Sequence, residues 1–191
     1  MTIVNARIVL VGTDEMERFG PEIVEVYRRA FGADPYRENE AQVRRFAEDA
    51  LPRHAQRAGF RCVVAIDTRE ETIGFAYGYV GGPGQWWYEN VASKVGPELL
   101  ERWASDYFEF VELAVHPAMQ RRGIGCALHD GLLDGVNQRT ALLSTREDET
   151  PALRLYRRRG WRQLLGGVQL PGATASIVVL GRPLPFDELG S

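Results

Sequence analysis

The sequence has little lysine, little cysteine and no long apolar run. Lys94 is the only lysine among the 191 residues, and 23 Lys and Arg residues against 26 Asp and Glu give a formal net charge of -3. Domains that bind nucleic acid usually carry a basic excess, because phosphate contacts depend on it. The charge balance therefore gives no reason to expect a nucleic-acid partner.

The scarcity of cysteine excludes a protein held together by a disulfide framework. Cys62 and Cys126 are the two cysteines, which is too few for a disulfide framework, and no spacing typical of metal ligands accompanies them. We therefore expect no metal and a reducing, cytoplasmic environment. The N-terminal stretch lacks the basic region of a signal peptide, and no segment approaches the ~20 apolar residues of a membrane span, so we also expect no membrane partner.

The residues that are present indicate one mixed α/β domain. Hydrophobic residues make up 45% of the chain, which is ample for one core at this length. Periodicity predicts strands over 6–11, 60–67, 72–80, 107–115, 140–147, 161–171 and 175–184, and helices over 13–32, 39–51, 97–104, 123–136 and 150–160. Hairpins and crossovers alternate, which predicts a mixed sheet of about seven strands with flanking helices in a single domain over 1–191.

Several local features refine this prediction. Pro21 is expected to restart the first helix, and Pro52 to break or kink the second. Gly74, Ala76 and Gly78 share one face of the strand 72–80, where small residues allow a close neighbour. Residues 81–106 interrupt the regular pattern as an irregular, aromatic-rich insertion.

The stretch "QRRGIG" (120–125) follows an apolar strand and opens a helix. Glycines at a helix N-terminus leave backbone N–H groups accessible, and these groups with the helix dipole favour an anion such as a phosphate. Arg121 and Arg122 would add charge-assisted contacts to such a ligand. A glycine-rich turn with solvated arginines is the alternative on spacing alone.

Two motifs resemble the GCN5-related N-acetyltransferases (GNAT). In "VELAVHPAMQRRGIGCALHDGLL", Gln120, Gly123 and Gly125 match the (Q/R)xxGx(G/A) signature with which that family binds acetyl-CoA. In "ETPALRLYRRRGW", a second family element of the form NxxAxxLYxxxGF is matched by Ala152, Leu155, Tyr156 and Gly160, with Trp161 in place of Phe. The order of elements over 6–181 agrees as well, so the resemblance covers nearly the whole chain.

The resemblance implies a cofactor site. In the family, the strand corresponding to 107–115 splays from the strand corresponding to 140–146, and acetyl-CoA lies in the cleft between them. Glu149 stands where the family has Asn, which puts the pantetheine contact usually made there in question. The residues that the resemblance assigns to acetyl-CoA are Leu113, Ala114, Val115, Gln120, Arg121, Arg122, Gly123, Ile124, Gly125, Cys126 and Tyr156.

A catalytic pair follows from the chemistry and the resemblance together. The acceptor amine must lose a proton and the coenzyme thiolate must gain one. Glu112 is the candidate base, because it lies on an apolar strand face and at a position where several family members carry a base. A structural pairing of Glu112 with an arginine is the alternative, and His116 or, less well placed, Glu109 could serve instead. Tyr156 is the candidate acid, with core packing as its alternative.

The sequence says less about the acceptor. Candidate substrate-binding residues are Tyr36, Tyr77, Tyr79, Trp86 and Trp87. Rings with Glu89 or Asp34 nearby could hold a cation, although Trp86 and Trp87 could instead cover a hydrophobic seam or a subunit contact. His54 and His129 are expected at the surface.

The resemblance implies an enzyme that uses acetyl-CoA to acetylate a primary amine of a small molecule or peptide. Neither the identity of that amine nor the length of the acyl group follows from the sequence, and both a monomer and a homodimer fit it. The alternative function is a non-catalytic acyl-CoA-binding module. The presence of both Glu112 and Tyr156 favours an enzyme.

Overall fold

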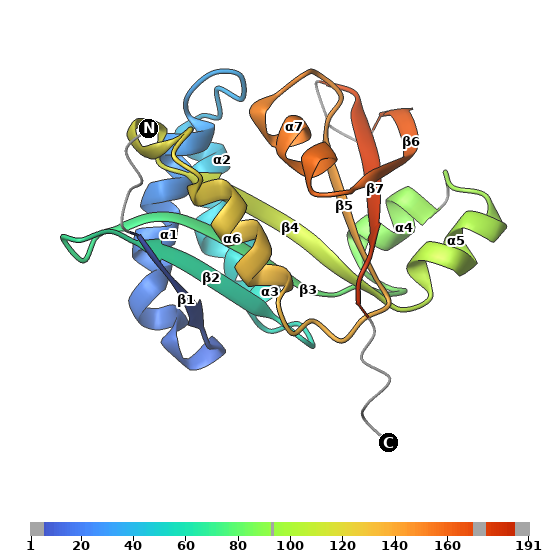
Figure 1. The fold of residues 1–191 in the computed structure, drawn as a ribbon, viewed down its shortest axis with the longest axis horizontal. Coiled ribbons are helices and arrows are strands. Elements are labelled where there is room, and N and C mark those ends of the chain that lie inside the picture. The colour runs from blue at the N-terminus through green and yellow to red at the C-terminus, as the bar shows by residue number, and fades with distance from the viewer. Residues whose placement is uncertain (1–5, 93, 170–174, 186–191) are drawn as a thin grey trace. The chain divides into compact units, whose positions relative to one another are not determined.

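The computed structural model describes residues 6–92, 94–169 and 175–185 (Figure 1). The end of the strand expected over 161–171 therefore lies outside the described residues. The chain divides into two compact units that are discontinuous in sequence. The first comprises residues 1–79 and 111–134, and the second comprises residues 80–110 and 135–191.

The seven strands are hydrogen-bonded in the order β1-β2-β3-β4-β5-β7-β6. The pairs β1–β2, β2–β3, β5–β7 and β6–β7 are antiparallel, and β4 pairs in parallel with β5. This arrangement confirms the predicted mixed sheet. The strands are β1 (Arg7–Val11), β2 (Arg61–Ile66), β3 (Thr72–Val80), β4 (Tyr107–Val115), β5 (Thr140–Arg146), β6 (Arg162–Val168) and β7 (Ile177–Pro183).

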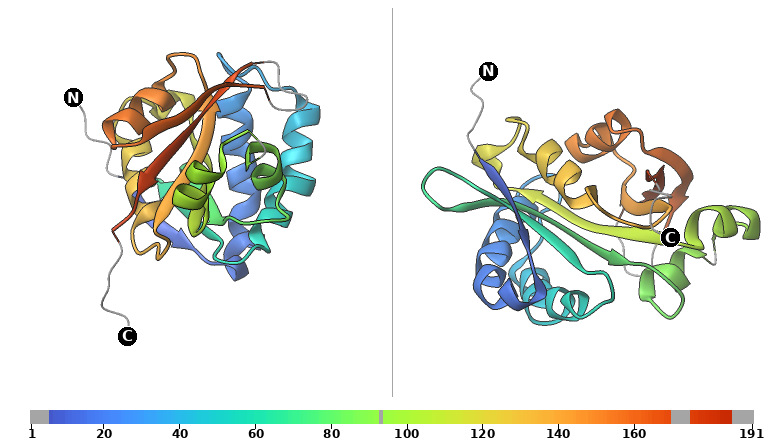
Figure 2. Two further views of the ribbon diagram at one scale, coloured as in Figure 1. Left: turned by 90° about the vertical axis from the view of Figure 1, so that its right-hand side faces the viewer. Right: turned by 60° about the horizontal axis from the view of Figure 1, so that its bottom comes forward.

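Helices cover both faces of the strands in the first unit. The short 3-10 helix η1 (Thr13–Glu15) leads into α1 (Met16–Phe31); α2 (Glu40–Arg45), the π-helical turn η2 (Phe46–Ala50) and α3 (Leu51–Ala55) follow as one run. These helices lie on one face of β2 and β3, and α6 (Ile124–Leu133) lies on the other (Figures 1 and 2). A β-carbon on Gly74 would lie 2.9 Å from Leu128 of α6, so the small-residue face of β3 admits the close approach that the sequence predicts.

Both prolines differ from expectation. Helix α1 continues through Pro21, because the ring and the Glu17 carbonyl that loses its N–H partner both belong to exposed residues. The helical run likewise continues past Pro52, which stands at the start of α3 directly after the π-helical turn. The wider turn accommodates a residue that cannot donate a backbone hydrogen bond.

The second unit is built on β5, β7, β6 and the first residues of β4. The insertion contains two helices, α4 (Trp86–Ala92) and α5 (Pro97–Ala104), of which the sequence predicted only α5. Figure 2 shows α4 and α5 on one side of β5 and β7, and α7 (Pro151–Arg158) on the other. Trp103 of α5 packs with Tyr107 and Leu142 as the buried core beneath that insertion.

No helix within the described ranges is long and apolar enough to cross a membrane. Cys62 and Cys126 are both free thiols; Cys62 is buried in the first unit and Cys126 is half-buried at the start of α6. Burial raises the pKa of the Cys62 thiol to about 12. The thiol therefore stays protonated, and Cys62 packs as a small apolar core residue.

Candidate active site

Strand β4 carries Glu112 on the face that the α1–α3 helices cover. Ala114, two residues along and therefore on the same face, belongs to a buried cluster with Tyr27, Phe46 and Tyr77. The sequence placed Glu112 on an apolar face, and this packing confirms that environment. The side chain is half-buried.

The surroundings of Glu112 favour its protonated form. Burial, and then the negative charge of Glu38, raise the pKa of the Glu112 carboxyl to about 8. Within the described part of the chain, no hydrogen bond or ion pair to the Glu112 carboxyl is found. The alternative of a structural pairing with an arginine therefore receives no support there. A carboxyl with a pKa near neutrality suits general base catalysis.

Tyr27 and Glu38 are polar neighbours of Glu112 that the sequence analysis missed. The Tyr27 hydroxyl donates a hydrogen bond of 2.7 Å to Oε2 of Glu38, and its ring stacks on Phe46 with centroids 3.8 Å apart. Burial raises the pKa of Tyr27, and the charges of Glu112 and Glu38 raise it further, so the hydroxyl remains a donor. In the sequence, Tyr27 reads as one residue of an apolar helix stripe and Glu38 as a loop residue.

Tyr77 and Tyr79 are buried on β3, next to a histidine that was expected at the surface. Nδ1 of His54 lies 3.0 Å from the Tyr77 hydroxyl, and its ring centroid is 5.1 Å from that of Tyr79. Burial, and then the charges of Arg53 and Arg57, lower the pKa of His54 to about 4, so its imidazole is neutral at pH 7. The surface prediction is wrong for His54, which is half-buried.

The same prediction is wrong for His129, whose side chain is fully buried in α6. Its Nδ1 lies 2.8 Å from Oδ1 of Asp130. The apolar stripe of α6, which includes Leu128 and Leu132, continues over His129. The width of an apolar helix face inferred from residue spacing is uncertain by about one residue on each side, and His129 lies within that margin.

The remaining acceptor-site candidates divide between the two units. Tyr36 is half-buried in the first unit and meets the ring of Phe31 edge to face at 4.9 Å. Trp86 and Trp87 belong to α4 of the second unit. Trp86 is exposed, whereas Trp87 packs against the core and donates a hydrogen bond of 3.0 Å from Nε1 to Oγ of Ser144.

The two carboxylates expected to accompany these rings have other partners. Asp34 forms an ion pair with Arg37, and Glu89 accepts a hydrogen bond of 2.8 Å from the backbone N–H of Gly84. Asp34 is therefore already paired with a cation, whereas Glu89 has no ion pair among the described residues.

The segment between β4 and α6 has the backbone of an anion-binding turn. Gly123, the residue before α6, has φ +86°, and Arg121 has φ +60°. A β-carbon built on Gly123 would meet nothing within 4 Å, so open space adjoins the backbone at the helix N-terminus. The first-turn N–H groups of α6, at Ile124, Gly125 and Cys126, have no partner within the helix.

The residues before this turn are held by local hydrogen bonds. The His116 backbone N–H donates to the Ile73 carbonyl at 2.9 Å, which ties the end of β4 to β3. Nδ1 of His116 accepts from the Ala118 N–H at 3.2 Å, so this histidine caps the 3-10 helix η3 (Pro117–Met119). Nε2 of Gln120 donates to the Val115 carbonyl at 3.1 Å.

Tyr156 lies on α7 of the second unit and is buried in an aromatic cluster. Its ring is edge to face with Phe110, at 5.9 Å, and with Trp161, at 5.7 Å. The helix begins as predicted, because Thr150 caps it by accepting a hydrogen bond of 3.1 Å from Leu153 N–H, and Pro151 follows.

Glu149 precedes this cap and forms an ion pair with Arg157 of α7. Its backbone carbonyl also accepts a hydrogen bond of 2.7 Å from Arg154 Nη1. The acidic residue at the family's Asn position therefore stabilises the helix through two arginines.

The family model of the GNAT acetyltransferases matches residues 21–161, well over half of the chain. The chain belongs to the GNAT family. Residues 21–161 include both motifs that the sequence analysis singled out.

Relatives of known sequence and structure agree with this membership. A GCN5-like protein acetyltransferase of Mycobacterium tuberculosis is 41% identical over 122 residues, which span 60% of this GNAT chain and 59% of that protein. The match thus covers less than two thirds of either protein.

The fold is shared with solved structures at low sequence identity. A putative GNAT acetyltransferase from Desulfovibrio desulfuricans superposes with a TM-score of 0.63 at 14% identity, covering 93% of this GNAT chain and 99% of that one. The ribosomal-protein-S18-alanine N-acetyltransferase of Escherichia coli superposes with a TM-score of 0.61 at 16% identity, covering 97% and 99%. These likenesses show the fold alone.

Proposed function

We propose that this GNAT protein transfers an acetyl group from acetyl-CoA directly to a primary amine of a small molecule or peptide. The observation that carries the proposal is Glu112, a half-buried carboxyl with no cation partner in the described residues and a pKa of about 8. A structural carboxylate would be paired or solvated, whereas a base that accepts a proton near neutral pH needs this environment.

The backbone from Arg121 to Cys126 would hold the pyrophosphate of acetyl-CoA. The open space beside Gly123 and the free N–H groups of the first turn of α6 fit an anionic group. Arg121 and Arg122 are exposed and can approach the same anion. Leu113, Ala114 and Val115 would supply backbone partners for the pantetheine arm. When bound, acetyl-CoA supplies the acetyl group as a thioester.

In the proposed reaction, Glu112 accepts the proton that the acceptor amine loses as its nitrogen bonds to the acetyl carbonyl carbon. The carbon–sulfur bond breaks, and the Tyr156 hydroxyl donates its proton to the departing sulfur. His116 is the weaker base candidate, because its Nδ1 already accepts a backbone hydrogen bond from Ala118. The chain's two units together then form one acetyltransferase domain, as the family match across both supports.

The two free thiols support our expectation of a reducing, cytoplasmic environment. The name of the mycobacterial relative, a protein acetyltransferase, keeps peptide amines among the candidate acceptors alongside small molecules. Tyr36, Tyr77 and Tyr79 are the acceptor-site candidates of the first unit, and Trp86 and Trp87 those of the second.

The proposal is tested by binding and by turnover. At 100 times its Kd, acetyl-CoA should stabilise the folded protein by about 2.7 kcal/mol and raise Tm by roughly 5–10 °C. Thiol release from acetyl-CoA with a panel of primary amines then detects transfer. Absence of any Tm shift with millimolar acetyl-CoA would exclude the cofactor. Binding without thiol release for any amine would favour the non-catalytic module.

A further inference from the structure

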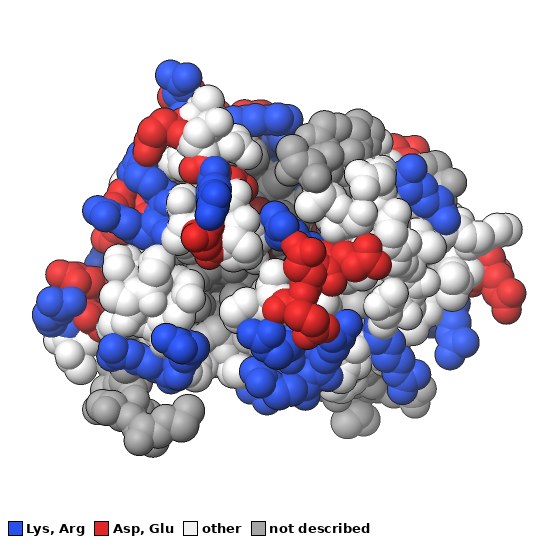
Figure 3. All heavy atoms as spheres, turned by 90° about the horizontal axis from the view of Figure 1, so that it is seen from above, with Lys and Arg blue, Asp and Glu red and all other residues white. Residues whose placement is uncertain are grey.

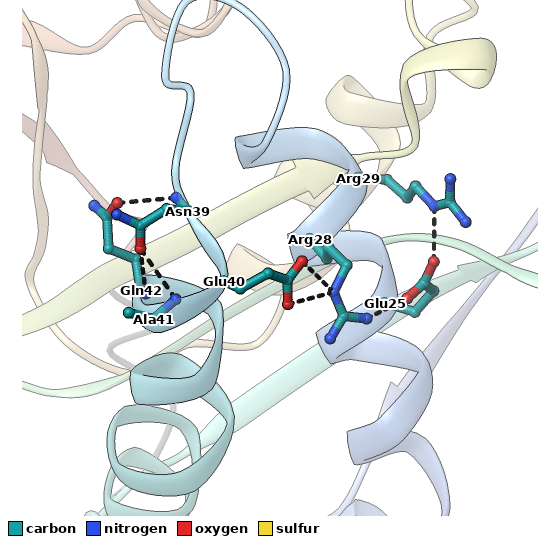
Figure 4. Close-up of polar contacts among 7 residues, drawn as sticks. All are labelled: Glu25, Arg28, Arg29, Asn39, Glu40, Ala41 and Gln42. Atoms are coloured by element: carbon teal, nitrogen blue, oxygen red, sulfur yellow. Dashed lines mark hydrogen bonds and ion pairs between the residues drawn. The ribbon is translucent and has the colours of Figure 1, made fainter.

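Three exposed carboxylates around α1 and the start of α2, those of Glu25, Asp34 and Glu40, each have an arginine partner. Glu25 pairs with Arg28 at 2.5 Å and with Arg29 at 2.7 Å (Figure 4). Glu40 pairs with the same Arg28 at 3.2 Å. On the face of the molecule that Figure 3 shows, basic and acidic side chains likewise lie side by side.

Glu38 departs from this pattern. It lies between Tyr36 and the Asn39 cap of α2, is half-buried, and takes a hydrogen bond to Oε2 from the Tyr27 hydroxyl. Among the described residues, no arginine, lysine or histidine forms an ion pair with it, and its Oε1 has no hydrogen-bond partner. One oxygen is thus fixed by a neutral donor, and the other is open.

Glu112 likewise has no ion pair among the described residues, and the charge of Glu38 acts on it. The negative charge of Glu38 is the charged contribution that raises the pKa of Glu112. The titratable groups that interact with Glu112 are Tyr27 from α1, Glu38 from the segment before α2 and Tyr77 from β3. None of these groups is a cation, so no positive charge is found among the groups that interact with Glu112.

Tyr27, the hydrogen-bond partner of Glu38, belongs to a cluster of aromatic rings. Tyr27 stacks on Phe46, and Phe46 lies 6.4 Å from Tyr77 by ring centroids. Tyr27 also meets Phe31 at 4.5 Å, and Phe31 meets Tyr36 at 4.9 Å. Ring faces attract cations and repel anions, so these rings favour a positively charged group.

Resting on the proposed function, we infer that Glu38 determines acceptor specificity: its carboxylate, oriented by the Tyr27 hydroxyl, binds a second positive charge of the acceptor beside the amine that Glu112 deprotonates. The acceptor class is a primary amine that carries another ammonium or guanidinium group.

The reaction itself supplies the reason for a second charge. The reacting nitrogen of a monoamine must be uncharged to attack the thioester, and Glu38 is then left without a counter-charge in a half-buried site. A second ammonium group does not take part in the transfer and stays charged throughout it. Its charge-assisted hydrogen bond to Oε1 of Glu38 therefore persists in the transition state, which raises kcat/KM and not only affinity.

The test compares diamines of three to six methylene groups with monoamines of equal length, using wild type, Glu38→Gln and Glu40→Gln. Glu40 is a matched control, because it is an exposed carboxylate two residues away with its own arginine. We expect wild type to prefer the diamine series. Glu38→Gln should lower kcat/KM for the best diamine by about 10–100-fold and for its monoamine by less than about threefold. Glu40→Gln should change neither.

A pH profile separates this role from a merely structural one. Glu38→Gln removes the charge that raises the pKa of Glu112, so the midpoint of the limb on which kcat/KM for the monoamine rises with pH should move to lower pH. Tyr27→Phe should weaken the diamine preference in the same direction, because it frees the Glu38 carboxylate to reorient. An unmoved midpoint together with an unchanged diamine preference in Glu38→Gln would overturn the inference.

Direct binding distinguishes this inference from the proposed function. Calorimetry of the diamines in the presence of desulfo-CoA should show weaker binding to Glu38→Gln than to wild type, whether or not transfer occurs. If wild type binds and acetylates amines but binds diamines and monoamines equally, the specificity role of Glu38 is wrong and the proposed function stands. If diamines bind through Glu38 but no thiol is released, the proposed function is wrong and the cation site stands.

Discussion

The rings of Tyr156 and Phe110 meet edge to face, with an interplanar angle of 79° and centroids 5.9 Å apart. Trp161 also meets both rings edge to face, with ring centroids 5.7 Å from Tyr156 and 6.0 Å from Phe110. These three rings in mutual contact orient the Tyr156 ring. The hydroxyl can therefore be removed with the packing retained.

Replacement of Tyr156 by Phe tests the proposed acid. If the hydroxyl protonates the coenzyme sulfur, turnover should fall by about 10²–10⁴-fold with acetyl-CoA affinity nearly intact. Stability should change by no more than about 1–1.5 kcal/mol, the value of one hydrogen bond. Tyr88→Phe, which changes a half-buried tyrosine of the second unit, is the control and should be silent. Wild-type turnover in Tyr156→Phe would leave Tyr156 a packing residue.

Glu112→Gln tests the proposed base through the pH–rate profile. Because the pKa of Glu112 is about 8, kcat/KM for the amine should rise with pH until this carboxyl is ionised near pH 8. The variant should lose this limb and at least about 10²-fold in rate at pH 8. Retention of the limb in Glu112→Gln would transfer the role to another group, with His116 the first to examine.

The same raised pKa predicts how stability depends on pH. A carboxyl whose folded-state pKa lies above its unfolded value near 4.5 binds its proton more tightly in the folded state. Its stabilising contribution is complete below about pH 4.5 and is lost as pH rises through about 8. Wild type should thus lose about 2–4 kcal/mol more than Glu112→Gln between pH 5 and 9. Urea titrations at both pH values measure it, with Glu40→Gln as the exposed control.

Gly123→Ala tests the diphosphate site, with Gly135→Ala as its control. Both glycines have positive φ, +86° and +71°, and a β-carbon on either meets nothing within 4 Å. Each substitution should therefore cost a similar ~1–2 kcal/mol from backbone strain. Only Gly123→Ala should weaken acetyl-CoA binding, by at least about tenfold, because the methyl group occupies the space beside the backbone donors. Equal Kd values for both variants would favour the solvated-turn alternative.

Gly81 and Gly82 form a second matched pair, this time for stability. A β-carbon on Gly81 would lie 2.0 Å from Cζ of the buried Tyr107, whereas one on Gly82 meets nothing within 4 Å. Gly81→Ala should lower the unfolding free energy by about 2–4 kcal/mol through overpacking, and Gly82→Ala should be near neutral. A small effect in Gly81→Ala would mean that the Tyr107 ring moves aside at little cost.

The regular elements were predictable because each has its own local signal. Strand β4 is apolar on both faces, α6 follows a glycine turn, and Thr150-Pro151 opens α7 in the order that caps a helix. The irregular insertion was predictable only in part. Pro97 marks the start of α5, but α4 begins at Trp86-Trp87, where no capping residue precedes an aromatic run.

The polar neighbours of Glu112 were not predictable from the sequence. Tyr27 and His54 are apolar-stripe or exposed-looking residues whose roles depend on partners 11 and 23 positions away, Glu38 and Tyr77. No local periodicity encodes such pairs. The effects of Pro21 and Pro52 on their helices were also not predictable from the sequence. A helix tolerates the missing N–H of a proline where the carbonyl that loses its partner is exposed to water or lies in a wider turn.

The division of strand β4 between the two units limits how the chain can be cut into fragments. Its first residues, up to Phe110, belong to one compact unit and its last, from Val111, to the other, while each unit also draws on a second, distant stretch of chain. A fragment that ends at Tyr79 or begins at Val80 leaves each unit without an essential piece. A single cut in the chain therefore cannot separate the two units.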